Sequence, residues 1–100
     1  MTRDAVLQTL RELYPTLRER YAIASLGIFG SVARGETNEA SDLDVAITFF
    51  PDARPSLMTL AGIMTDIEDA VGRPVDLIEH RPDLRPRFLR MLERDLVRVA

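Results

Sequence analysis

The residues best suited to chemistry lie in two short segments, the first of which is the run GSVARG that begins at Gly30. A glycine that ends a strand at a sharp turn lets the amide and hydroxyl of Ser31 converge on an anion such as a phosphate. Arg34 can bring a planar, charged donor fork to the same oxygens, and Gly35 lets the chain leave the loop with unusual dihedral angles. The segment therefore predicts a phosphate-binding loop.

The second segment is the run SDLD, which begins at Ser41 and enters a predicted strand. Asp42 and Asp44 are two residues apart, so their side chains project from one face of the strand with their backbones about 7 Å apart. Asp76 stands in a later, otherwise apolar strand and points away from its hydrophobic neighbours. If the two strands are adjacent, the three carboxylates meet at one point.

Carboxylates held together in this way indicate a divalent metal site. Burying an unpaired carboxylate is costly, so a role as a metal ligand explains Asp76 better than a place in the core. Oxygen ligands without histidine or thiol favour Mg²⁺, with Mn²⁺ as an alternative, over Zn²⁺. Two ions about 3.5–4 Å apart would bridge Asp42, Asp44 and Asp76 to nucleotide phosphates and stabilise an in-line displacement. The chemistry indicated is nucleotidyl transfer.

The elements that must position these residues alternate between helices and strands. In chain order, the sequence predicts a helix capped by Thr2, a short second helix over 15–20, a strand over 23–29, a polar loop over 30–41, a strand over 43–49, a helix over 57–71 closed by Gly72, a strand over 74–79 and a last helix with Leu84 to Leu96 on one stripe. This order predicts an α/β domain of the α+β type, with helices packed on a small sheet and residues 1–100 forming a single domain.

The composition indicates in which compartment this domain works and which partners it does not bind. Of 100 residues, 46% are hydrophobic, and the formal net charge is −3. The chain has no cysteine, which excludes disulfide and thiolate chemistry and favours a cytoplasmic protein. The acidic balance argues against extended nucleic-acid binding, and no apolar run is long enough to cross a membrane.

The run GSVARGETNEASDLDV, residues 30–45, resembles the signature of the minimal nucleotidyltransferases of the DNA polymerase β superfamily. The similarity continues from LRELYPTLRERY through VDLIE to the arginine-rich last helix. The resemblance implies a nucleotidyltransferase fold, that is, a mixed sheet flanked by helices. It also implies an NTP substrate and a metal-dependent transfer of a nucleoside monophosphate to an acceptor hydroxyl, with pyrophosphate leaving.

The resemblance also implies a role for each residue of the motif. Asp42 and Asp44 match the two metal ligands, and Asp76 matches the third carboxylate, which ligates metal and helps to activate the acceptor. Nucleotide-phosphate binding falls to Gly30, Ser31, Arg34 and Ser41; for Arg34, phosphate contact and loop anchoring are both open.

The length of the chain predicts that a second chain supplies the acceptor, because little material remains to enclose one. The resemblance implies a small helical partner of the HEPN type, an RNase toxin, which this protein would neutralise as an antitoxin by adding AMP from ATP to a tyrosine. The stripe of Phe88, Met91 and Leu92 could contribute to that interface, although core packing is the favoured interpretation.

Two other functions stay open on the sequence alone. A binding module could silence its partner by occlusion and keep the motif unused, or a transferase could act on a small molecule or an RNA end. His80 is expected in a solvated loop rather than at the reaction centre, and Tyr14 and Tyr21 are expected to pack rather than to stack on bases.

Overall fold

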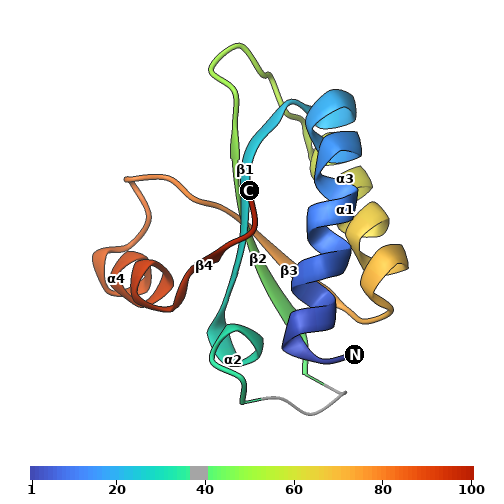
Figure 1. Ribbon diagram of the computed structural model, residues 1–100. Helices are drawn as coiled ribbons and strands as arrows, with labels where there is room; N and C mark the ends of the chain where they lie inside the picture. The colour runs from blue at the N-terminus through green and yellow to red at the C-terminus, as the bar shows by residue number, and fades with distance from the viewer. Residues whose placement is uncertain (37–40) are drawn as a thin grey trace.

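The computed structural model describes residues 1–36 and 41–100, which form helices and strands arranged around one sheet (Figure 1). The elements are α1 (Arg3–Tyr21), β1 (Ile23–Phe29), α2 (Gly30–Ala33), β2 (Leu43–Phe49), α3 (Leu57–Val71), β3 (Val75–Glu79), α4 (Pro86–Asp95) and β4 (Val97–Arg98). The strands over 23–29 and 43–49 and the helix over 57–71 are confirmed with their predicted bounds. No helix in the described part of the chain is long and apolar enough to cross a membrane.

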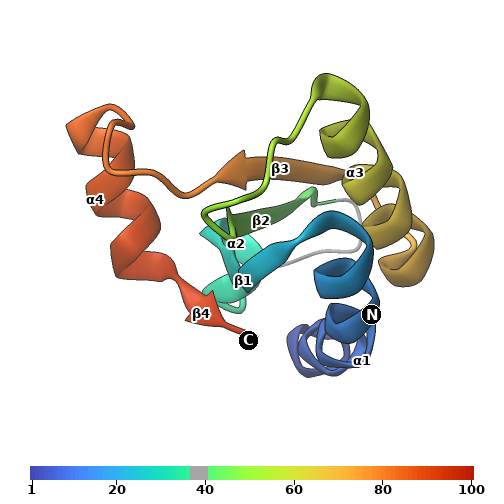
Figure 2. The same ribbon diagram turned by 90° about the horizontal axis from the view of Figure 1, so that it is seen from above.

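The sheet is mixed, with the strand order β3-β2-β1-β4. Strand β1 pairs antiparallel with β2 and β4, whereas β2 and β3 are parallel and are joined through α3. Figure 2 shows the sheet between two layers, with α1 and α3 on one side and α4 on the other. The predicted architecture of a small mixed sheet packed against helices is therefore confirmed.

The main hydrophobic core lies between the sheet and the layer of α1 and α3. Alternation along β2 sends Val45 and Ile47 into this core, where both side chains are fully buried. Helices α1 and α3 contribute their own apolar stripes, including Leu10, Leu17 and Ile63. A second, smaller cluster on the opposite face joins Phe29, Ala46 and Leu92 and attaches α4 to the sheet.

Helix α1 corrects one prediction, because it runs through Pro15 without the expected break. A proline inside a helix removes a backbone hydrogen bond at a cost of about 3 kcal/mol. Here Leu10 and Leu17, on either side of the proline, are both fully buried against the sheet. The Tyr14 hydroxyl also donates to the Ala24 carbonyl at 2.8 Å, so packing along the whole stripe outweighs the lost bond.

The C-terminal region corrects a second prediction, because α4 ends at Asp95 and does not include Leu96. The backbone of Leu96 is extended (φ −60°, ψ 125°), and residues Val97–Arg98 form β4 beside Gly27 and Ile28 of β1. The edge of β1 offers unpaired backbone groups, and pairing with them replaces further helix.

The predicted loop over 30–41 is also corrected at its start, where Gly30–Ala33 forms the short helix α2. Val32 and Ala33 are buried, which holds this turn against the core. The part of the predicted loop at residues 37–40 lies outside the described residues.

Candidate active site

The predicted carboxylates lie on the face of the sheet that α4 covers. Parallel pairing of β2 with β3 places Asp44 directly opposite Asp76. The start of β3 is held in this register because the Leu43 amide donates to the Pro74 carbonyl at 2.9 Å, and the Val75 amide donates to the Glu68 carboxylate at 2.9 Å. The condition set by the sequence, that the two strands be neighbours, is therefore met.

The grouping of the carboxylates affects the ionisation of Asp44. Partial burial raises the pKa of Asp44 above its ordinary value, and the charges of Asp76 and Asp42 and a hydrogen bond with Asp76 raise it further. The nearby Arg34 charge acts in the opposite direction. The negative charges of neighbouring carboxylates repel each other, so a proton or a cation between them stabilises the arrangement.

The glycine–serine bend lies against the same carboxylate. Gly30 adopts φ +74°, in the left-handed region, and a Cβ atom built on it would overlap the Asp44 carboxylate. Only glycine fits both the backbone and the space at this position. Ser31 follows as a half-buried residue at the start of α2, and Ser41 lies in the bend before β2.

A hollow of about 400 Å³ opens beside the paired aspartates. Its lining combines Asp44 and Asp76 with side chains from the sheet, α3 and α4, namely Phe29, Met64, Leu77, Ile78, Phe88 and Met91. Phe88 packs edge-to-face on Phe29, with ring centroids 6.0 Å apart. A larger hollow of about 470 Å³ beside Tyr14 is lined by none of the three aspartates.

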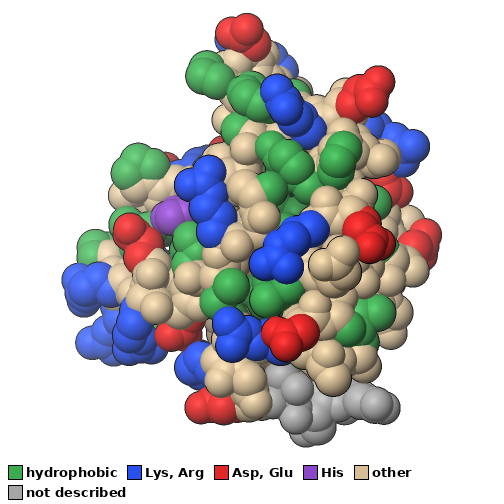
Figure 3. Space-filling model, in the orientation of Figure 1, with side chains coloured by type: hydrophobic (Ala, Val, Ile, Leu, Met, Phe, Trp, Pro, Cys, Tyr) green, Lys and Arg blue, Asp and Glu red, His purple; other side chains and the backbone are tan. Residues whose placement is uncertain are grey.

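Helix α4 thus has two separate surfaces. Leu92 is fully buried, whereas Phe88 and Met91 are partly buried and form a wall of the hollow beside the aspartates. The favoured interpretation of this stripe as packing is confirmed for Leu92. Basic side chains gather over α4 on the outer surface (Figure 3), where Arg87 and Arg90 are exposed.

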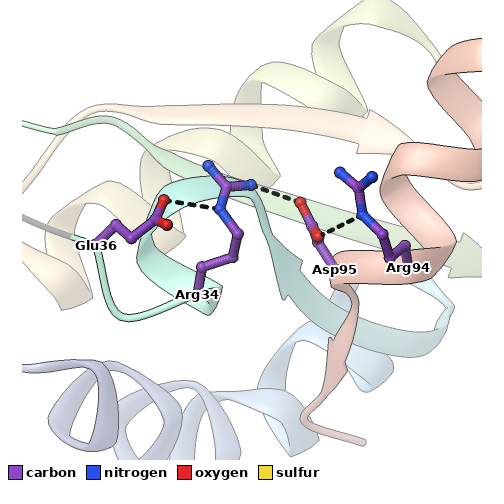
Figure 4. Close-up of polar contacts among 4 residues, drawn as sticks. All are labelled: Arg34, Glu36, Arg94 and Asp95. Atoms are coloured by element: carbon purple, nitrogen blue, oxygen red, sulfur yellow. Dashed lines mark hydrogen bonds and ion pairs between the residues drawn. The ribbon is translucent and has the colours of Figure 1, made fainter.

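Arg34 is held by acidic side chains at the end of α2. Its Nε donates to Glu36 at 2.8 Å, and its Nη1 donates to Asp95 at 2.6 Å. Asp95 also accepts a hydrogen bond from Arg94 at 3.2 Å, which completes the network in Figure 4. Asp95 was not predicted from the sequence, because the predicted last helix extends to Leu96 and only the structure shows that α4 ends at Asp95.

His80 lies apart from the aspartate pair. Its backbone amide donates to the Ile47 carbonyl at 2.8 Å. It follows β3 as a half-buried residue and lines a different hollow together with Ser25 and Thr48, so it lies away from the aspartates as expected. The tyrosines pack as predicted, and the Tyr21 hydroxyl donates to Asp66 at 2.7 Å.

The donor set suits a hard divalent cation. Within residues 1–36 and 41–100, no group of three His, Cys, Asp or Glu side chains is already arranged as a metal site. Asp44 and Asp76 nevertheless face each other, with Asp42 exposed one pleat away, and all of their donor atoms are carboxylate oxygens. Carboxylate oxygens grouped in this way fit Mg²⁺ or Mn²⁺.

This geometry agrees with the family to which the chain is related by sequence. The model of the nucleotidyltransferase domain family matches residues 10–99, so the chain belongs to the nucleotidyltransferase family and is an enzyme of that class. Among its relatives is MJ1379 of Methanocaldococcus jannaschii, named as a candidate protein adenylyltransferase, which is 32% identical over 98 residues and 98% of each chain.

Solved structures show the same fold. A candidate minimal nucleotidyltransferase superposes with a TM-score of 0.75 at 32% identity, covering 97% of this chain and 95% of the other. A complex of a tri-AMPylated Shewanella oneidensis HEPN toxin with its MNT antitoxin matches with a TM-score of 0.64 at 12% identity, covering 94% of this chain and 71% of the other. The latter likeness concerns the fold.

Proposed function

We propose that the chain is a Mg²⁺-dependent nucleotidyltransferase that transfers AMP from ATP to a hydroxyl of a partner protein. The observation that carries this proposal is the pairing of Asp44 with Asp76 across two parallel strands, directly against the Gly30 bend. Acidic residues next to a phosphate-binding turn are what a nucleotide with a bound divalent cation requires.

The residues divide the work between binding and proton transfer. The Ser31 amide and hydroxyl, at the start of α2, bind phosphate oxygens of the nucleotide, and Asp42, Asp44 and Asp76 would hold the metal. Bound there, Mg²⁺ would neutralise phosphate charge and stabilise the oxygens of the displacement. The exposed carboxylate of Asp76 takes the proton of the acceptor hydroxyl.

The reaction balances without another reactant. The acceptor oxygen forms a bond with the α-phosphorus of ATP, and the bond from that phosphorus to the bridging oxygen breaks. Pyrophosphate leaves with the bonding electrons, and the hydroxyl proton passes to Asp76.

We propose further that the acceptor belongs to a HEPN-type toxin and that this chain acts as its antitoxin. The support is the adenylyltransferase name of the relative from Methanocaldococcus jannaschii and the likeness to the fold of an MNT antitoxin. Residues 1–100 as one domain and a cytoplasmic setting stay predictions.

The decisive experiment identifies the protein that co-purifies with the chain and measures its mass after incubation with ATP and Mg²⁺. We expect a mass increase of one or more AMP groups on the partner, abolished in Asp44→Asn. Neutralisation of the partner that persists in Asp44→Asn, with no mass increase in the wild type, would indicate occlusion instead.

A further inference from the structure

We infer that Asp95 is a positioning residue for the phosphate-binding bend, and that it holds the segment Gly30–Gly35 against α4 through Arg34. The inference rests on the proposed function in one respect, since the bend is taken to bind nucleotide phosphates. It concerns a residue outside the motif and resolves the two roles left open for Arg34.

The ion pair between Arg34 and Asp95 is short, and its carboxylate is buried. The Asp95 side chain is 5% exposed, and one of its oxygens accepts from Arg34 Nη1 at 2.6 Å. Its other oxygen accepts from Arg94 Nε at 3.2 Å, from the neighbouring position of the same helix. Both oxygens of the carboxylate therefore have arginine donors, and one of these donors comes from a residue 61 positions away in the chain.

The position of Asp95 is unfavourable without these partners. It is the last residue of α4, where the carbonyl end of the helix dipole repels a negative charge. Burial by itself raises the pKa of Asp95, but hydrogen bonds from Arg94 and Arg34 outweigh it and lower the pKa below its ordinary value. Contact with arginine, rather than helix formation, explains an aspartate here.

Arg34 connects this carboxylate to the bend. Its backbone amide donates to the Gly30 carbonyl at 3.1 Å, so its main chain closes the turn that begins at Gly30. Its guanidinium uses Nη1 for Asp95 and Nε for the exposed Glu36. The geometry therefore favours anchoring of the loop over phosphate contact as the function of this arginine.

The Arg34–Asp95 contact fixes the distance between helix α4 and the bend that begins at Gly30. Helix α4 contributes Phe88 and Met91 to the hollow that contains Asp44 and Asp76. The Arg34–Asp95 pair joins the C-terminal end of that helix to the bend, whose Gly30 lies against Asp44. A shift of about 1 Å in a positioned group can cost about 100-fold in rate, so a loose bend would impair nucleotide binding and transfer.

The test compares Asp95→Asn and Arg34→Gln, singly and together, in the full chain. The probes are the dissociation constant of AMP-PNP with Mg²⁺ and the hydrogen-exchange rate of backbone amides in residues 29–36 without nucleotide. We expect each single variant to weaken AMP-PNP binding about tenfold and to speed exchange in this segment, and the double variant to be no worse than either, because both remove one contact.

Glu36→Gln is the matched control, because it removes the other, more exposed acceptor of the same guanidinium, 65% exposed against 5% for Asp95. We expect it to change AMP-PNP affinity less than about twofold. Asp95→Glu retains the charge and should restore part of the affinity lost in Asp95→Asn. If Asp95→Asn fails to fold, the AMP-PNP affinities of Asp95→Glu, which keeps the negative charge, and Arg34→Gln, which removes the contact, still test whether the pair positions the bend.

Wild-type affinity and exchange in Asp95→Asn would overturn the inference, as would losses that multiply in the double variant. Failure of the proposed function is separately visible: wild-type protein would then transfer no AMP, while exchange over residues 29–36 would still report whether Asp95 anchors the bend. Tm values for every variant separate a general loss of stability from loosening confined to this segment.

Discussion

The two faces of the sheet differ in composition although one strand contributes to both. On the side of α1 and α3, β2 presents Val45 and Ile47, which are fully buried in a continuous apolar core. On the side of α4, the same strand presents Asp44, Ala46 and Thr48, and apolar packing is confined to a small cluster. The residues of the main core and the proposed metal ligands thus lie on opposite faces of the sheet, one residue apart along the chain.

This division explains how the protein tolerates facing carboxylates. Parallel strands β2 and β3 are held by α3, whose Ile63 and Ile67 are fully buried on the opposite face. The repulsion between Asp44 and Asp76 is therefore opposed by apolar packing on the other face of the sheet. Functional residues often reduce stability where they stand, and other parts of the fold compensate.

The largest effect should come from removing one charge on the α4 face. We expect Asp44→Asn to lower AMP transfer at least about 100-fold, because it removes a proposed metal ligand and its negative charge. The measurement is incorporation of labelled AMP into the co-purified partner. Asp52→Asn, in the exposed turn before α3, is the control and should be fully active. Full activity in Asp44→Asn would remove the proposed role of this face.

A substitution on the face that packs against α1 and α3 should reduce stability and leave nucleotide binding intact. Ile47 is fully buried, so Ile47→Ala should lower the free energy of unfolding by about 2–5 kcal/mol, through lost burial and a residual cavity. AMP-PNP affinity per folded molecule should remain that of the wild type. Urea denaturation measures the free energy of unfolding, and titration calorimetry measures the affinity for AMP-PNP. A large loss of affinity in folded protein would show that the faces are not separable.

Gly30→Ala tests the point where the bend meets the carboxylates. The substitution adds left-handed strain and a methyl group that overlaps Asp44, so we expect AMP-PNP affinity to fall about tenfold. Gly72→Ala is a matched control, because Gly72 has φ +70° but open space around the added carbon. It should lose about 1 kcal/mol of stability without loss of affinity. Equal affinities in the two variants would argue against contact between the bend and the site.

The smallest expected effect is that of pH and Mg²⁺ on the stability of the protein without nucleotide. Since burial and neighbouring charges raise the pKa of Asp44, its ionised form destabilises the folded state at pH values above that pKa, and stability rises as pH falls through the raised pKa toward the ordinary value. Mg²⁺ should offset this penalty at pH 7 and raise the Tm by a few degrees, whereas Asp44→Asn should raise the Tm without Mg²⁺ and respond less to the ion. Scanning calorimetry with and without Mg²⁺ makes the comparison, and an equal Mg²⁺ response in both proteins would contradict it.

Local patterns predicted much of this arrangement. Alternation in β2 and β3 predicted that Asp44 and Asp76 point away from their apolar neighbours, because a strand has a fixed period of two, but the adjacency of the two strands came from the structure. The course of α1 through Pro15 depended on burial at both ends of the helix, which a local rule about proline does not contain. Strand β4 has only two residues and is too short for any periodic signal.

The Arg34–Asp95 contact was beyond sequence reasoning for a different reason. It joins positions that are 61 residues apart, and neither residue carries a pattern that selects the other. Contacts of this kind become visible only when the path of the chain is known. The catalytic roles of the motif residues, by contrast, were proposed from the sequence and stay predictions.

The parallel pairing of β2 with β3 has a consequence for biosynthesis. The two strands are joined through α3, so the ribosome must release that helix and β3 before Asp76 can dock beside Asp44. A nascent chain that ends within α3 carries the whole signature run but only one side of its acidic pair. The two aspartates therefore come together only after β3 has left the ribosome.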